Sequence, residues 1–273
     1  MSDLPWEDRG WLDEAAAWID ARIVRTGELE VLRTRPWSAL VRVPTADGDA
    51  WFKESAPADA YEAALTELLA ARRPECIPEV LAAERARLLT ASAGPSAREV
   101  PEQVDWEEIV RLYAELQIEL ASSAGELLDL GVPDSRPETL GHPVPGPLPI
   151  TLIHEEVQDG NVHLRDGRPV LIDWAEASVS HPFAGMTNTL RIVAWRSDWE
   201  PGGREVLRLR DAYLGPWMRF APLDELRAIF AEGYALGALA RAASWERIGD
   251  REKADAWREI YAEACSAEAR LGA

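Results

Sequence analysis

The 273-residue sequence contains only two cysteines, Cys76 and Cys265, and no long apolar run. No segment approaches the roughly 18 consecutive apolar residues that a membrane-spanning helix needs. The opening residues MSDLPWEDRG are partly acidic and lack the apolar stretch of a secretory signal. The two cysteines lie far apart in the chain and need not pair, which is consistent with a reducing compartment. We therefore expect a cytoplasmic protein.

Basic residues are also in short supply. The chain has 29 Lys and Arg against 48 Asp and Glu, for a formal net charge of −19. This deficit argues against nucleic-acid binding, because contacts to phosphates need Lys and Arg. An acidic chain tends to attract cationic small molecules, although solubility is the commoner reason for such a balance. The absence of a G-x-S-x-G motif argues against an α/β-hydrolase.

The residues that are present have the composition of a globular protein, with 47% hydrophobic and 28% charged residues. The N-terminal part reads as mixed α and β. Apolar spacing and turn residues predict the following elements: a helix over 11–24, strands over 39–43 and 50–53 that turn at Asp47-Gly48, and a helix from Pro57 to about Arg72. A connecting segment is expected near 88–100.

The remainder of the chain is predicted to be mostly helical. Residues 105–129 have helical spacing, with Asp105 as a plausible N-cap residue. Residues 137–149 form a proline-rich loop, and everything from about 204 onward is helical in pattern. One hairpin, turning on Asp166-Gly167, interrupts the helices.

That hairpin belongs to the most informative segment, HEEVQDGNVHLRDGRPVLIDW, residues 154–174. If Asp166-Gly167 is a two-residue turn, Asn161 faces Ile172 across the two strands, and Asp173 lies one residue beyond. An amide oxygen and a carboxylate then come together at one open end. Mg²⁺ takes one or two such protein oxygens and leaves its other positions to water and phosphate.

The spacing of His154, Asn161 and Asp173 resembles the catalytic loop of the aminoglycoside phosphotransferases and related small-molecule kinases. The family motif is His-x-Asp, four residues, Asn, and a hairpin that ends in a metal-binding aspartate. The resemblance implies that Asn161 and Asp173 hold Mg²⁺ and that His154 is a mainly structural member of the catalytic loop.

The resemblance also implies a fold and an activity. The fold would be an α+β, two-lobed, protein-kinase-like one, with a small five-stranded antiparallel N-lobe and a larger, mostly helical C-lobe. Residues 1–94 would bind the nucleotide, and residues 95–273 would carry the catalytic loop and the acceptor site. The activity would be an ATP-dependent, or GTP-dependent, transfer of phosphate to a hydroxyl of a small molecule, which the acidic composition suggests is cationic.

The sequence departs from the family pattern at Glu156, where the family places the aspartate that accepts the proton of the acceptor hydroxyl. Glutamate keeps the carboxylate but moves its oxygens by more than about 1 Å, and a misplacement of about that size can cost a hundredfold in rate. Glu156 is the predicted base, with Asp159 a weaker alternative because Asp159-Gly160 reads as a turn. A pseudokinase that binds a nucleotide or metabolite without turnover is the competing hypothesis.

Two residues of the N-terminal part fit the same interpretation. Lys53 ends the second predicted strand, where kinase-like folds carry the lysine that contacts the α- and β-phosphates. Glu62 or Glu67 on the next helix could pair with it. A helical wheel places Glu62 at the edge of the apolar face and Glu67 on the opposite side, so Glu62 is the predicted partner.

Overall fold

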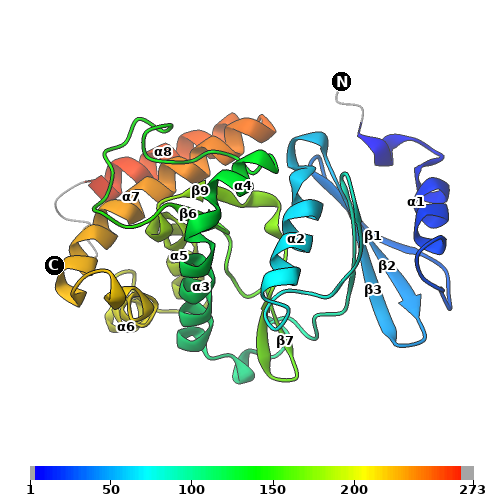
Figure 1. Ribbon diagram of the computed structural model, residues 1–273, viewed down its shortest axis with the longest axis horizontal. Coiled ribbons are helices and arrows are strands. Elements are labelled where there is room, and N and C mark those ends of the chain that lie inside the picture. The colour runs from blue at the N-terminus through cyan, green and yellow to red at the C-terminus, as the bar shows by residue number, and fades with distance from the viewer. Residues whose placement is uncertain (1–3, 266–273) are drawn as a thin grey trace. The chain divides into compact units, whose positions relative to one another are not determined.

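The computed structural model describes residues 4–265 and divides into two compact units. The first consists of the described chain up to Pro95 together with His163–Ala175, and the second of Ser96–Val162 and the chain from Glu176 onward. A five-stranded sheet dominates the first unit and helices dominate the second, so the predicted α+β class with a sheet lobe and a helical lobe is confirmed (Figure 1). The division adds the hairpin segment to the first unit, whereas the single boundary predicted at 94/95 left it in the second.

The sheet of the first unit is antiparallel, with strand order β1-β2-β3-β5-β4. Its strands are β1 (Glu30–Thr34), β2 (Ser38–Thr45), β3 (Gly48–Ser55), β4 (Val80–Glu84) and β5 (Arg87–Ala91). Two of these, β2 and β3, were predicted from the sequence pattern. The predicted connecting segment near 88–100 was wrong at its start, because residues 88–91 belong to β5.

The two faces of this sheet are covered by α1 (Trp11–Asp20) and α2 (Tyr61–Arg72) (Figure 1). Trp18 and Ile19 of α1 pack with Phe52 and other apolar residues in one buried cluster. Side chains alternate between the faces of a strand, so Lys53, next to Phe52, faces the side of α2. The helix predicted over 11–24 ends earlier than expected, at Asp20.

Both predicted hairpins are present. The β2–β3 turn lies one residue earlier than expected, since Gly48, with φ of +113°, already pairs with Thr45. The second hairpin joins β7 (Val162–Arg165) to β8 (Arg168–Leu171) through Asp166 and Gly167. Both turn residues have positive φ, 53° and 76°, as a tight two-residue hairpin turn requires.

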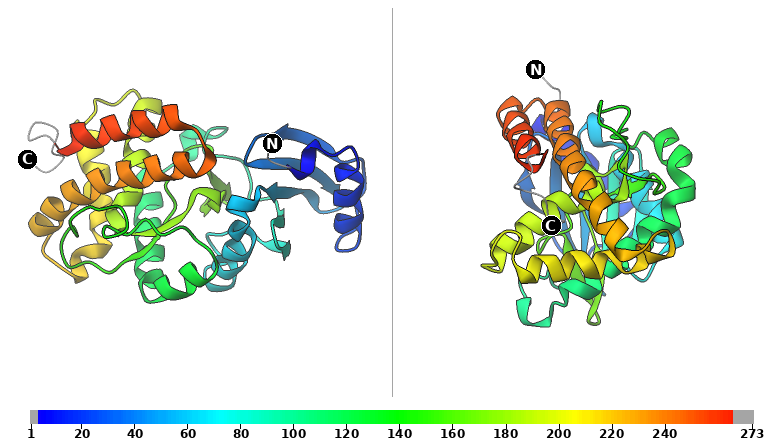
Figure 2. Two further views of the ribbon diagram at one scale, coloured as in Figure 1. Left: turned by 90° about the horizontal axis from the view of Figure 1, so that it is seen from above. Right: turned by 90° about the vertical axis from the view of Figure 1, so that its left-hand side faces the viewer.

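The second unit is built from six helices among its described residues and one small sheet. The helices are α3 (Trp106–Leu120), α4 (Ala124–Asp129), α5 (Met186–Arg196), α6 (Arg204–Leu214), α7 (Leu223–Ile248) and α8 (Arg251–Cys265). The small sheet pairs β6 (Thr151–Ile153) with β9 (Ser178–Ser180). Figure 2 shows α7 and α8 running side by side.

Asp105 caps α3, as predicted, by accepting hydrogen bonds from the backbone N–H groups of Glu107 (2.9 Å) and Glu108 (3.2 Å). The single helix expected over 105–129 is interrupted by a 3₁₀ turn at Ala121–Ser123 and continues as α4.

The long helix α7 passes unusually close to the segment Pro182–Gly185. A side chain at Gly237 would overlap Thr187 and the carbonyl oxygen of Ala184, and one at Gly233 would crowd Phe183 and His181. The two glycines are four residues apart and therefore lie on one face of the helix. They allow the close approach that fixes the position of α7.

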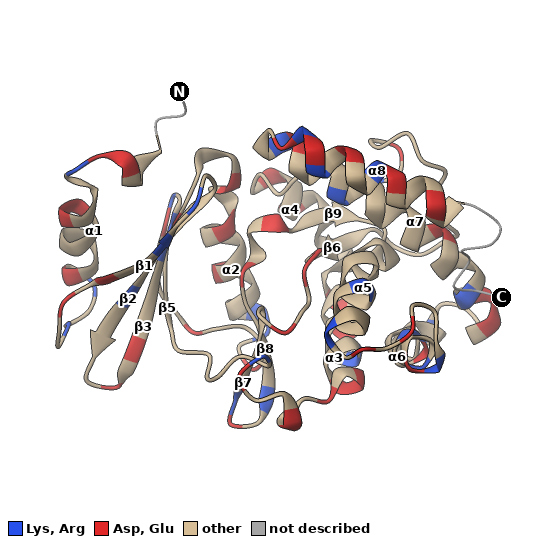
Figure 3. Cartoon of the chain, turned by 180° about the vertical axis from the view of Figure 1, so that it is seen from behind, with Lys and Arg blue, Asp and Glu red and all other residues tan. Residues whose placement is uncertain are grey.

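Cys76 is buried, Cys265 is exposed, and each is a thiol. Acidic residues are spread along α1, α2 and α8, among other elements, which fits the solubility interpretation of the net charge (Figure 3). Among residues 4–265, no helix combines the length and the apolarity that crossing a membrane demands.

Candidate nucleotide and acceptor site

Lys53, in the central strand β3, is the focus of the polar residues of the first unit. Its Nζ lies 2.8 Å from Oε1 of Glu62 and 2.6 Å from Oδ1 of Asp173. The Ser55 hydroxyl donates a second hydrogen bond to Glu62, at 2.7 Å. Burial acts to lower the pKa of Lys53, but the charges of Asp173 and Glu62 outweigh it and raise the pKa above its usual value. The ammonium group is therefore charged and held between two carboxylates.

The choice between Glu62 and Glu67 follows the helical wheel. Glu62, in the first turn of α2, is 2% exposed and contacts Lys53, whereas Glu67 faces water. The position of Glu62 is as expected. Its role in nucleotide binding stays a prediction.

Asp173 follows β8 with a backbone φ of +63°, a conformation that is uncommon for residues other than glycine. Its second carboxylate oxygen lies 3.8 Å from the Arg33 guanidinium. The chain directly after it is anchored, because Trp174 is buried and the Tyr61 hydroxyl donates a hydrogen bond to the carbonyl of Ala175. An aspartate held in such a conformation by its surroundings is a candidate functional group.

In the second unit, the loop after β6 carries His154, Glu156 and Asn161. His154 is fully buried, and its Nδ1 accepts a hydrogen bond of 3.3 Å from the backbone N–H of Glu156. The Asn161 Nδ2 donates to the carbonyl oxygen of Glu156 at 3.1 Å, and Oδ1 therefore points away from that carbonyl. The backbone of Glu156 is thus held by the two residues whose spacing identified the loop.

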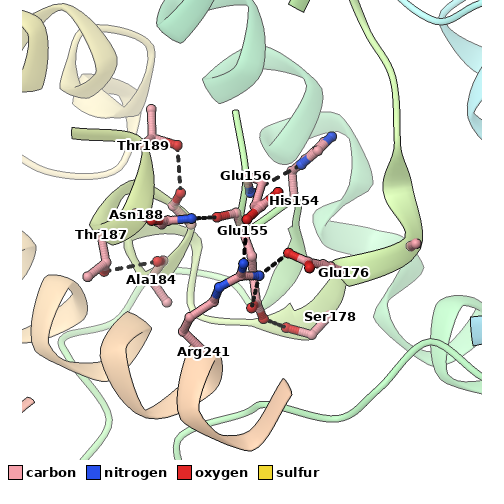
Figure 4. A network of polar contacts seen from close by, with 12 residues as sticks. His154, Glu155, Glu156, Glu176, Ser178, Ala184, Thr187, Asn188, Thr189 and Arg241 are labelled. Atoms are coloured by element: carbon pink, nitrogen blue, oxygen red, sulfur yellow. Dashed lines mark hydrogen bonds and ion pairs between the residues drawn. The ribbon is translucent and has the colours of Figure 1, made fainter. Parts of the chain in front are cut away.

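The side chain of Glu156 is bound by Arg241, on α7. One terminal nitrogen of Arg241 donates to Glu156, and the other donates to Glu176 and lies 3.9 Å from Glu155 (Figure 4). Burial acts to lower the pKa of the Arg241 guanidinium, but the three carboxylates raise it by more. Glu176, which follows the hairpin, is thereby paired within the protein.

Glu155 is the most unusual of the three glutamates. It has a φ of +66° and is 4% exposed, and its Oε1 accepts a hydrogen bond of 2.8 Å from Ser178. Its backbone carbonyl accepts one from Asn188. Burial raises the pKa of Glu155 to about 7, against the opposing effects of Arg241 and Ser178.

Asp159, the alternative base, is engaged elsewhere. It forms an ion pair of 2.8 Å with Arg98 and lies 3.6 Å from Arg196. The hydrogen bond from Arg98 lowers the pKa of Asp159. These contacts are those of a loop-fixing turn residue, which weakens the case for Asp159 as a base.

Asn161 and Asp173 belong to different units, and their joint role as metal ligands stays a prediction. Their donor atoms suit Mg²⁺, since an amide oxygen and a carboxylate are hard oxygen ligands. Within residues 4–265, no three His, Cys, Asp or Glu side chains gather as a metal-binding cluster.

Comparison with known proteins gives a clear result for the fold. No protein-family model matches the sequence, and no curated protein matches it. Solved structures do match. The macrolide 2'-phosphotransferase type I is 18% identical with a TM-score of 0.63, and the match covers 93% of this chain and 97% of that one. The GDP and kanamycin complex of APH(2'')-IIIa is 16% identical with a TM-score of 0.58, covering 92% and 98%. The ethanolamine kinase of Plasmodium vivax is 11% identical with a TM-score of 0.66, covering 100% and 92%.

The chain shares the kinase-like fold of these phosphotransferase and kinase structures. At these identities the likeness concerns the kinase-like fold alone, and the chemistry has to be argued from the site.

Two arginines of the site were missed at the sequence level. Arg241 had one signal, because it is the one charged residue in the small, apolar helical run GALARAAS. Arg33 lies in the exposed strand β1, and no pattern in the sequence singles it out.

Proposed function

We propose that the protein transfers the terminal phosphoryl group of ATP or GTP to a hydroxyl of a small molecule. The observation that carries the proposal is the Glu62–Lys53–Asp173 arrangement, in which a buried lysine on a central strand is held between two carboxylates. Kinase-like sites use such a lysine to contact the nucleotide phosphates. The shared fold with structures named as phosphotransferases and kinases adds support.

The roles of the residues follow from their chemistry. Lys53, oriented by Glu62, would contact the phosphates. Asn161 and Asp173 would hold Mg²⁺, which neutralises phosphate charge when bound. The acceptor oxygen forms a bond to the terminal phosphorus, the bond to the leaving nucleoside diphosphate breaks, and the hydroxyl proton passes to the carboxylate of Glu156.

The acceptor class is proposed to be a cationic molecule with a hydroxyl group. The net charge of −19 favours cations near the protein, and one of the similar structures contains kanamycin while another is an ethanolamine kinase. Glu176 is a poor receptor for such a cation, because Arg241 already binds its carboxylate.

A second candidate function is a pseudokinase that binds the nucleotide without turnover. The observation that favours it is the ion pair between Glu156 and Arg241, which engages the carboxylate that would accept the proton. Transfer of labelled phosphate to a panel of kanamycin, a macrolide, choline and ethanolamine separates the two candidates. Transfer to any of these supports the enzyme, and nucleotide binding without transfer or hydrolysis supports the pseudokinase.

The first test of the proposal is a thermal shift with ATP and GTP, each with and without Mg²⁺. A ligand at a hundredfold excess over its Kd stabilises the folded state by about 2.7 kcal/mol. We expect a Mg²⁺-dependent shift of several degrees for the wild type and its loss in Asp173→Ala.

The matched control is Asp49→Ala, which removes an aspartate of the same unit that pairs with Arg42 and not with Lys53. This variant should keep the full shift. If neither nucleotide shifts the wild type at millimolar concentration, the nucleotide site is absent and the proposed function is wrong.

A further inference from the structure

We propose that Arg241 is a positioning residue for the Glu156 carboxylate, and that Glu156 and Arg241 work as a matched pair when the acceptor hydroxyl is oriented. The inference rests on the proposed phosphotransferase function and assigns a role to a residue of α7, far from the catalytic loop in sequence.

The first step of the argument is the way Glu156 is held. Its backbone N–H donates to His154 and its carbonyl oxygen accepts from Asn161, so the main chain is fixed on both sides. The remaining freedom is that of the side chain. Arg241 removes it by binding one carboxylate oxygen.

The second step is the relative depth of the two groups. The Arg241 side chain is 5% exposed and that of Glu156 is 25% exposed, so the guanidinium lies behind the carboxylate and presents it outward. An arrangement that only tied α7 to the loop would not need a carboxylate that reaches solvent. This one leaves a quarter of the Glu156 side chain exposed to solvent.

The third step is that Arg241 is itself held by further contacts. Its other terminal nitrogen binds Glu176, and its guanidinium lies 5.1 Å from the centre of the Trp245 ring. Gly237, one turn earlier, lets α7 approach the Pro182–Gly185 segment. A planar guanidinium fixed in this way holds two carboxylates in a set geometry, which the single point charge of a lysine does not.

The fourth step concerns length. Glutamate reaches one carbon–carbon bond, roughly 1.5 Å, further than aspartate. An aspartate at position 156 would draw the carboxylate away from Arg241. The longer residue is therefore matched to the arginine, and Glu156→Asp should impair the protein even though aspartate is the residue of the family motif.

The experiment measures kcat and KM for Mg·ATP hydrolysis, with water as the acceptor, in Arg241→Lys, Arg241→Gln, Glu156→Asp and the Arg241→Lys/Glu156→Asp double variant. We expect kcat to fall about 10- to 100-fold in each single variant, with KM for ATP unchanged within about twofold. The double variant should be no worse than the poorer single one, because each change breaks the same contact.

The matched control is Arg210→Gln. Arg210, on α6, is as deeply buried as Arg241 and pairs with Asp211, away from Glu156. It should lose stability while keeping kcat. If Arg241→Gln does not fold, Arg241→Lys decides, because it retains the charge.

Three results would overturn the proposal. Full kcat in Arg241→Lys would mean that only the charge matters, and a higher kcat in Arg241→Gln would mean that Arg241 sequesters Glu156. Multiplicative losses in the double variant would mean that the two residues act independently. Failure of the proposed function appears separately, as a wild type that shows no Mg²⁺-dependent nucleotide shift or no hydrolysis, and it removes the basis of the pair as well.

Discussion

Two residues of the candidate site, Glu155 and Asp173, have conformations that lower the stability of the fold. Glu155 and Asp173 both have left-handed backbone conformations, at φ of +66° and +63°. Such a conformation costs an L-residue roughly 1–2 kcal/mol relative to the right-handed one. Glu155 is also a buried carboxylate. Strain concentrated beside a candidate catalytic residue is consistent with a site shaped for function at the expense of stability.

The buried carboxylate of Glu155 predicts a pH dependence of stability. Its pKa is raised to about 7 in the folded state, above the ordinary value of 4.5, so the folded state binds the proton more tightly than the unfolded state. The stabilisation is present below about pH 4.5 and is lost as the pH rises through about 7, to a total of about 3 kcal/mol. Glu155→Gln cannot ionise. We expect its melting temperature to rise relative to the wild type between pH 5 and pH 8, and an unchanging difference would show that Glu155 is ionised throughout.

The sequence allows some of these residues to be placed and not others. The resemblance to kinase-like folds selects Lys53 at the end of its strand, and the periodicity of α2 selects Glu62 over Glu67, so this pair could be predicted. Arg241 lies 85 residues from Glu156 in the chain. Periodicity identifies a face of a helix but not the carboxylate that the face meets, so this pair could not be predicted.

At the scale of elements, the position of α7 depends on two small residues. Gly237 would give a side chain no room against Thr187 and the backbone of Ala184. Although alanine favours a helix by about 1 kcal/mol over glycine, overpacking costs typically 1–3 kcal/mol. We expect Gly237→Ala to lower the melting temperature and the free energy of unfolding.

The matched control for this prediction is Gly125→Ala, in α4. A side chain there meets no atom within 4 Å, so only the helix preference acts, and this variant should be stabilised by up to about 1 kcal/mol. Denaturant titration of both variants gives the comparison. Equal stabilisation of the two would contradict close packing at Gly237.

Elements marked by capping or turn residues in the sequence were predicted, and the strand β1, which has neither alternating burial nor such residues, was not. Asp105 caps α3 and Asp166-Gly167 turns the second hairpin as expected, because each depends on neighbouring backbone groups. The strand β1 has no alternation of burial, since all five of its residues are exposed. Its pairing with β2 is a tertiary contact that periodicity does not report.

At the scale of the whole molecule, the two units share the chain in an interlaced way. The sheet unit is completed by His163–Ala175, which comes after 67 residues of the second unit, Ser96–Val162. Arg165 donates to the carbonyl oxygens of Pro74 and Glu75, and the Leu171 N–H donates to that of Cys76. Composition shifts along the sequence suggest one domain boundary. They do not reveal that a later segment, His163–Ala175, belongs to the first unit.

The backbone hydrogen bond between Leu171 and Cys76 places a buried thiol next to the hairpin, so the reactivity of that thiol can report local opening. The Cys76 thiol is 1% exposed and reacts only when its unit opens, while the exposed Cys265 reacts at once. In a Cys265→Ser background, the slow reaction with Ellman's reagent should report how often the hairpin that carries Asp173 leaves the sheet unit. Under the proposed function, Mg·ATP should slow this reaction further, and a rate insensitive to the nucleotide would contradict the role of Asp173. The reaction rate of the Cys76 thiol thus measures the local opening of the unit that carries Asp173.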